Sequence, residues 1–121
     1  MKESYKEKVK KLLEDAEKAL QAQAWTSAAN SYDSAIEGML RYHIKQRHHV
    51  DVGYNWKKVP EELRSKGIDV EEKIERLMLD LAELRYISGR GIGYHAGTAW
   101  ADEDSAKKYQ KLALRIYKEL A

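Results

Sequence analysis

The sequence predicts an all-α protein, an antiparallel up-down-up-down four-helix bundle with a short extra helix between the second and third long helices. Four stretches place apolar residues three and four positions apart, and no segment alternates apolar and polar residues as a strand would. The chain has one Pro and seven Gly, too few for a loop-rich β architecture. At 121 residues it has the length of one domain, 1–121.

The first two long helices are predicted between residues 4 and 49. The second of them ends in a group of cationic residues. The first begins at Ser4, where Glu7 follows at the spacing of a capping box. A short break at 21–25 separates it from the second helix, for which Thr26 or Ser27 is the expected cap. Two long helices joined by so short a break are expected to be antiparallel neighbours.

Residues 49–67 are predicted to be irregular except for one short helix. Pro60 suits the first position of that helix, and Gly67 is expected to end it. Asp69 is then the expected cap of the third long helix, whose apolar positions run through 70–84.

Three glycines mark the end of the third long helix. Gly89, Gly91 and Gly93 would each cost about 1 kcal/mol in a helix interior, so the helix is expected to stop there. The last helix is predicted to begin near Asp102 and to carry apolar residues as far as Leu120.

Composition excludes several classes of protein. Lys and Arg number 22 and Asp and Glu number 20, a net charge of +2, which excludes a grossly basic nucleic-acid coat. Without Cys there is no disulfide and no thiolate zinc site. No apolar run is long enough for a membrane span, so we expect no membrane partner and a cytoplasmic location. The excess of charged residues over Asn and Gln is typical of a thermophile.

The segment 85–95 carries the residues best suited to chemistry. An Arg that grips a phosphate, close to a His that titrates near neutral pH, can cleave RNA without a metal ion. Arg90 and His95 are the predicted catalytic pair, with no metal and no cofactor. Arg85, Tyr94 and Trp100 are predicted auxiliary contacts to phosphate or base, although the aromatic residues there, with Trp25, also suit a subunit interface.

The pattern Arg90-x4-His95, placed after the third long helix, resembles the Arg-x4-6-His signature of HEPN domains (higher eukaryotes and prokaryotes nucleotide-binding). The resemblance extends to residues 24–36, which look like the junction of that family's opening helices, and to 103–113, which look like its last helix. It implies a homodimer, a nucleotidyltransferase-type protein partner in a toxin-antitoxin arrangement, and RNA or a nucleotide as ligand. In active members it implies a metal-independent endoribonuclease with one motif from each chain.

Two other functions stay open. Active members of the family commonly follow the Arg with a polar residue, and here that position is Gly91. This favours a non-catalytic HEPN-like module that binds a nucleotide or a nucleotidyltransferase partner. Residues 12–37 also resemble one tetratricopeptide-type hairpin, which implies a helical interaction scaffold, although the repeat does not return in the second half of the chain.

A basic cluster is the second candidate site. It is interleaved with Tyr54 and Trp56, so it could contact an RNA backbone and stack a base, or be a solvated helix end. Three histidines nearby, His43, His48 and His49, are expected to spread around the helix rather than to bind a metal. The predicted RNA-backbone patch consists of Arg41, Lys45, Arg47, His48, Lys57 and Lys58.

Overall fold

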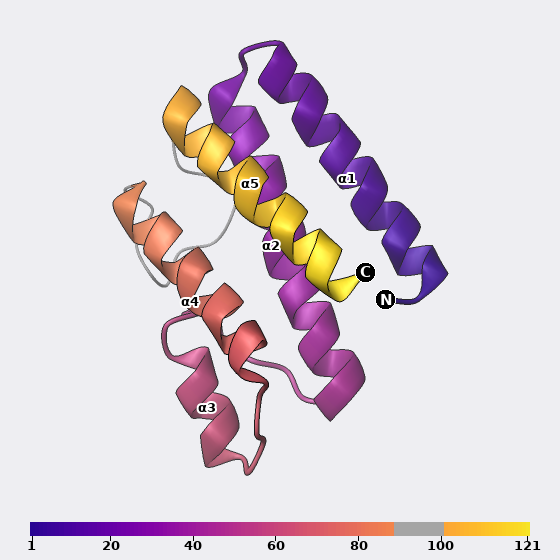
Figure 1. Cartoon of the computed structure of the whole chain (residues 1–121), viewed down its shortest axis with the longest axis vertical. Coiled ribbons are helices and arrows are strands. Elements are labelled where there is room, and N and C mark those ends of the chain that lie inside the picture. Colours follow the sequence, from indigo (N-terminus) through magenta and orange to yellow (C-terminus); the bar gives the residue numbers. More distant parts are fainter. Residues whose placement is uncertain (89–100) are drawn as a thin grey trace. The chain divides into compact units, whose positions relative to one another are not determined.

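The structure, a computed structural model, describes residues 1–88 and 101–121, and every regular element in these ranges is a helix. The prediction of an all-α protein is therefore confirmed for this part of the chain. Figure 1 shows the helices in chain order. They are α1 (Glu3–Gln21), α2 (Trp25–His48), α3 (Val59–Ser65), α4 (Glu72–Ile87) and α5 (Glu103–Leu120).

The short helix α3 begins and ends as the sequence predicted. Pro60 lies in its first turn, where the missing N–H of proline costs no helical hydrogen bond. Gly67 follows the helix with φ +74°. Its N–H donates to the carbonyl of Arg64, and the N–H of Ile68 donates to the carbonyl of Leu63, both at 3.0 Å. This is a Schellman ending, for which glycine is the preferred residue.

The predicted helix starts had different outcomes. The last helix begins near Asp102 as predicted, and Asp102 caps it, since its Oδ1 accepts the backbone N–H of Ser105 at 2.8 Å. The capping box at Ser4 is wrong because α1 begins one residue earlier, after Lys2, with no side-chain cap. The cap at Asp69 is also wrong. Helix α4 follows Glu71, which makes no side-chain cap bond.

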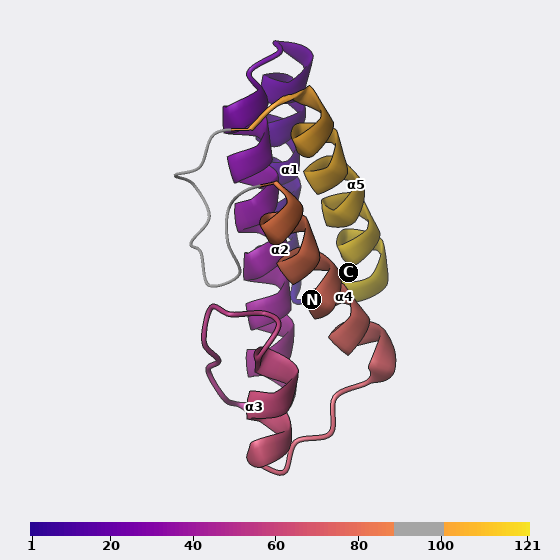
Figure 2. The same cartoon turned by 90° about the vertical axis from the view of Figure 1, so that its left-hand side faces the viewer.

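The chain forms two compact units, and the boundary between them falls inside α2, after Met39. The first unit contains residues 1–39 and the described residues from 101 onward. In it, α1 lies beside α5 (Figures 1 and 2). Its buried apolar side chains come from α1, from the first half of α2 and from α5. The largest are Tyr32, Ile36, Met39, Tyr109 and Ile116.

The second unit contains the second half of α2, the segment 49–58, α3 and α4. Here α3 packs on α4. The indole of Trp56 is fully buried among the apolar side chains of this unit, so the irregular segment that carries it is fixed to the helices. The other large buried side chains are Leu40, Ile44, Leu63, Ile74, Met78 and Leu81. In the described part of the chain, none of the helices combines the length and the apolar composition that crossing a bilayer requires.

Candidate functional site

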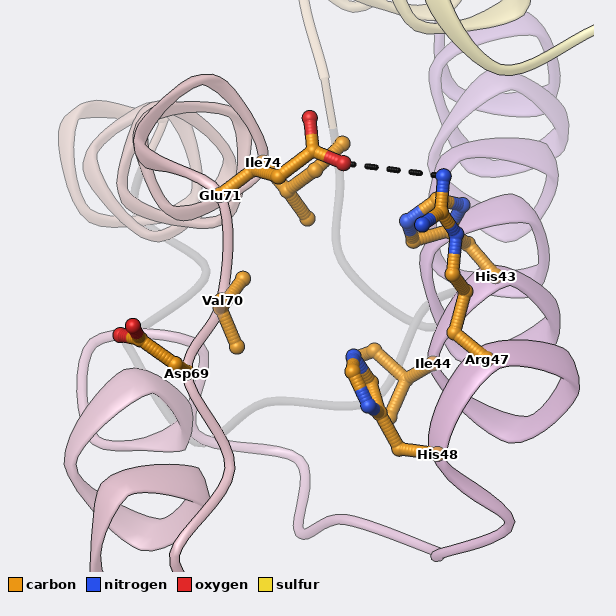
Figure 3. Close-up of a pocket in the computed structure, with 8 residues that line it drawn as sticks. All are labelled: His43, Ile44, Arg47, His48, Asp69, Val70, Glu71 and Ile74. Atoms are coloured by element: carbon orange, nitrogen blue, oxygen red, sulfur yellow. Dashed lines mark ion pairs between the residues drawn. The ribbon is translucent and has the colours of Figure 1, made fainter.

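A polar pocket lies in the second unit, between the end of α2 and the segment that enters α4 (Figure 3). Its volume of about 50 Å³ is enough for a few water molecules or one small ion. One wall carries two imidazoles and a guanidinium, and the other carries the carboxylate of Glu71, whereas the carboxylate of Asp69 points away from α2 (Figure 3). The lining residues are His43, Ile44, Arg47 and His48 on α2, and Asp69, Val70, Glu71 and Ile74 on the opposite side.

An ion pair closes one side of this pocket. The guanidinium of Arg47 lies 3.6 Å from a carboxylate oxygen of Glu71 (Figure 3). Half or more of each side chain is exposed, 58% for Arg47 and 50% for Glu71. Water screens such a pair, which therefore contributes little to stability. Its role is positional, because it joins the last turn of α2 to the residue before α4.

His43 is the titratable group most changed by this environment. Burial lowers the pKa of its imidazole, and the positive charge of Arg47 lowers it further, whereas the carboxylate of Glu71 acts in the opposite direction. The ring is therefore neutral at neutral pH, with one nitrogen able to donate a hydrogen bond and the other able to accept one. Such a ring can exchange a proton with a small polar molecule in the pocket.

His43 and His48 line the same pocket. The two residues are five positions apart on α2, as the expectation that the histidines spread around the helix requires, and both still border this pocket. Among residues 1–88 and 101–121, no group of three or more His, Asp or Glu side chains is arranged to hold a metal ion.

The first cation of the predicted RNA-backbone patch, Arg41, holds the loop that follows α2. Its two terminal nitrogens donate to the carbonyls of Val52 at 2.8 Å and Gly53 at 3.1 Å. Its guanidinium also lies over the ring of Tyr54, 4.5 Å from the centroid, a cation–π contact. Lys45 is engaged by the same loop, with Nζ 3.3 Å from a carboxylate oxygen of Asp51.

The aromatic residues of this patch differ in exposure. Trp56 is fully buried, so the expectation that it stacks on a base is wrong: its ring has already been removed from water by the protein. Tyr54 is 43% exposed, although Arg41 covers one part of its ring. Lys57 and Lys58 are exposed.

Arg85 was expected in the loop after the third long helix, as an auxiliary phosphate contact. It lies instead in the last turns of α4, with a fully buried side chain. A guanidinium in that position presents no surface to a ligand in solvent. Trp25 is the first residue of α2 and is partly exposed. The remaining predicted site residues lie outside the residues that the structure describes. They are Arg90, Tyr94, His95 and Trp100.

The side of the pocket that faces α2, with Asp69 and Glu71, was not predicted as part of a site. Asp69 was interpreted as a helix cap, and Glu71 was not singled out. The sequence did contain a signal, the order of the charges along the chain. The second long helix ends in cationic residues, and the segment before the third long helix is acidic. Segments of opposite charge attract one another when the fold brings them together.

No family model matches the chain, and comparisons with curated proteins and with solved structures also give no significant match.

Proposed function

We propose that the protein is a HEPN-like homodimer that cleaves single-stranded RNA without a metal ion, with Arg90 and His95 as the catalytic pair. The supporting observation is the position of helix boundaries around this pair. Helix α4 ends at Ile87 and α5 is capped by Asp102, so in sequence both residues fall between these two helices, where the resemblance requires the motif. The proposal includes an up-down-up-down arrangement of α1, α2, α4 and α5.

The proposed reaction is an internal transfer at phosphorus. A histidine takes the proton of a ribose 2′-hydroxyl, and O2′ forms a bond to the neighbouring phosphorus while the bond from phosphorus to O5′ breaks. An acid returns a proton to O5′, and the dimer supplies a second His95 for this step. Arg90 donates hydrogen bonds to the phosphoryl oxygens, where negative charge increases in the transition state.

The test is cleavage of a labelled single-stranded RNA in EDTA. The wild-type protein should cut the RNA, and His95→Ala and Arg90→Ala should each lower the rate by about 100-fold or more. His49→Asn is the matched control. His49 is exposed and has φ 58°, a conformation that Asn accepts readily. Equal losses in His49→Asn and His95→Ala, or wild-type activity in His95→Ala, would contradict the assignment.

One observation favours a second candidate, a non-catalytic HEPN-like module that binds a nucleotide or a nucleotidyltransferase-type partner. The cations Arg41, Lys45 and Arg47 of the predicted RNA patch are engaged by carbonyls and carboxylates of the protein. This leaves fewer free charges for a long RNA backbone than the sequence implied. In the same assay this candidate predicts no cleavage and a measurable affinity for a mononucleotide.

A further inference from the structure

Helix α4 has an apolar strip on its outer side. Leu79 is 42% exposed and Tyr86 is 68% exposed. They lie seven residues apart and so share one face of the helix, and Ala82, which is buried, lies between them at the base of this face. Ile87, 57% exposed, flanks this face. Of the six large apolar side chains that are most exposed in the described residues, three belong to this one helix.

The strip forms one side of a shallow groove of about 450 Å³, which lies entirely within the second unit. Leu79, Ala82 and Tyr86 provide the apolar lining. Two opposite charges complete the groove, Lys57 from the segment before α3 and Glu83 from α4. Within the described part of the chain, neither the ammonium of Lys57 nor the carboxylate of Glu83 is held in an ion pair.

This combination is self-complementary. A two-fold contact brings the same surface from two copies together, so each charge must find its opposite on an identical partner. A groove with one cation, one anion and an apolar centre meets this condition, whereas a groove of a single charge would repel its own copy. Ala82 at the middle of the strip is small enough to let two helices approach closely.

We infer that this groove binds a second copy of the chain, with two α4 helices crossing near Ala82. In this contact Leu79 of one copy packs on Tyr86 of the other, and Lys57 of each faces Glu83 of the other. The inference deepens the proposed function, which requires a homodimer, by assigning the surface that forms it.

The expected dimer is concentration-dependent. A helix of 16 residues is about 24 Å long, and its outer face alone covers less than the roughly 800 Å² per partner of a standard stable interface. We therefore expect dissociation in the micromolar range, which sedimentation equilibrium measures directly. The measurement is made on the full chain without RNA.

The first variant tests the apolar strip. Tyr86→Glu places a charge at the most exposed position of the strip, so folding should be unaffected and the dimer should dissociate at least about tenfold more readily. Leu114→Glu is the matched control, because Leu114 is 50% exposed on α5 and outside the groove. A dimer that survives Tyr86→Glu, or a wild-type chain that stays monomeric at every concentration, would overturn the inference.

The second experiment tests the two-fold symmetry. Lys57→Glu and Glu83→Lys should each weaken self-association, since each places two like charges opposite one another. An equimolar mixture of these two variants should form mixed dimers, because both opposed pairs are then of opposite charge. The double variant Lys57→Glu/Glu83→Lys should dimerise as the wild type does. Absence of mixed dimers would overturn the two-fold arrangement.

These measurements separate this inference from the RNA-cleaving activity. If the protein dimerises through α4 but leaves RNA intact, the nuclease activity is refuted and the assigned dimer surface stands. If the protein cleaves RNA but none of the groove variants weakens its dimer, the assigned dimer surface is refuted and the nuclease activity stands.

Discussion

The hydroxyl of Thr26 exchanges two hydrogen bonds with the backbone of Ala101, 75 residues further along the chain. Its oxygen accepts the N–H of Ala101 at 3.0 Å and donates to the carbonyl of the same residue at 3.3 Å. Thr26 was expected to cap its own helix. It joins the start of α2 to the residue before the cap of α5 instead, so the entrances to two helices of the first unit are fixed together.

Thr26→Val should lower the free energy of unfolding by about 1–3 kcal/mol, because the buried N–H of Ala101 loses its acceptor while the shape of the side chain is retained. Thr26→Ser keeps the hydroxyl and should retain most of the stability. Urea denaturation followed by circular dichroism measures both. Wild-type stability in Thr26→Val would contradict a stabilising role for the hydroxyl.

The guanidinium of Arg41 should be needed for its shape as well as its charge. Lys has one charged nitrogen and cannot donate to the carbonyls of Val52 and Gly53 in the same fork. Arg41→Lys should therefore cost about 1 kcal/mol of stability and expose the segment 49–58 to proteolysis. Lys58→Ala, in the same segment, is the control. A rate of cleavage unchanged by Arg41→Lys would mean that the fork does not hold this loop.

Two glycines of the second unit should respond differently to alanine. Gly67 has φ +74°, so Gly67→Ala should destabilise the protein by about 1 kcal/mol through backbone strain alone. Gly53 has no such conformation, and the nearest atom to an added Cβ, Oε2 of Glu62, is at 3.5 Å. Gly53→Ala should change stability by less than about 0.5 kcal/mol. Thermal unfolding of the two variants compares them, and equal losses would contradict the Schellman ending.

The lowered pKa of His43 makes stability depend on pH. The folded protein binds fewer protons at this ring than the unfolded chain, whose imidazole has the usual pKa of 6.5. Stability is therefore complete above pH 6.5 and falls as the pH drops toward the lower folded pKa. After burial, the groups that act on the pKa of this ring include Arg47 and His48, which lower it, and Glu71, which raises it.

Removing the imidazole should flatten this dependence. His43→Gln should lose less stability than the wild type when the pH is lowered through this range, and His49→Asn should behave as the wild type does. Unfolding midpoints in urea at a series of pH values give the comparison. A wild-type slope in His43→Gln would assign the pH dependence to another group.

Periodicity and local chemistry predicted the helices correctly because these signals are local. Apolar spacing located the long helices, and Pro60 and Gly67 bounded the short one through their own backbone restrictions. The start of the last helix near Asp102 was also predicted. The local patterns for a helix cap were equally good at Ser4, Thr26 and Asp69. The helices beside Ser4 and Asp69 begin at other residues. The hydroxyl of Thr26 instead forms hydrogen bonds with a residue distant in sequence.

The sites depended on contacts that no local pattern encodes. The spacing of His43 and His48 does not show that both line one pocket. The position of Trp56 beside lysines does not show that its side chain is buried in the core of the second unit. Arg85 lies near the glycine-rich segment in sequence, yet α4 continues past it and buries it. Whether a polar or aromatic residue is available to a ligand is decided by packing.

The chemistry of the RNA ends tests the central proposal most directly. A single-stranded RNA incubated with the protein in EDTA should give fragments with a 5′-hydroxyl and a 2′,3′-cyclic phosphate, and a matched RNA with every 2′-hydroxyl methylated should stay intact. Mass spectrometry of the fragments identifies the ends. Fragments that carry a 5′-phosphate, or cleavage of the methylated RNA, would contradict attack by the ribose hydroxyl, and an RNA left uncut would contradict the nuclease altogether.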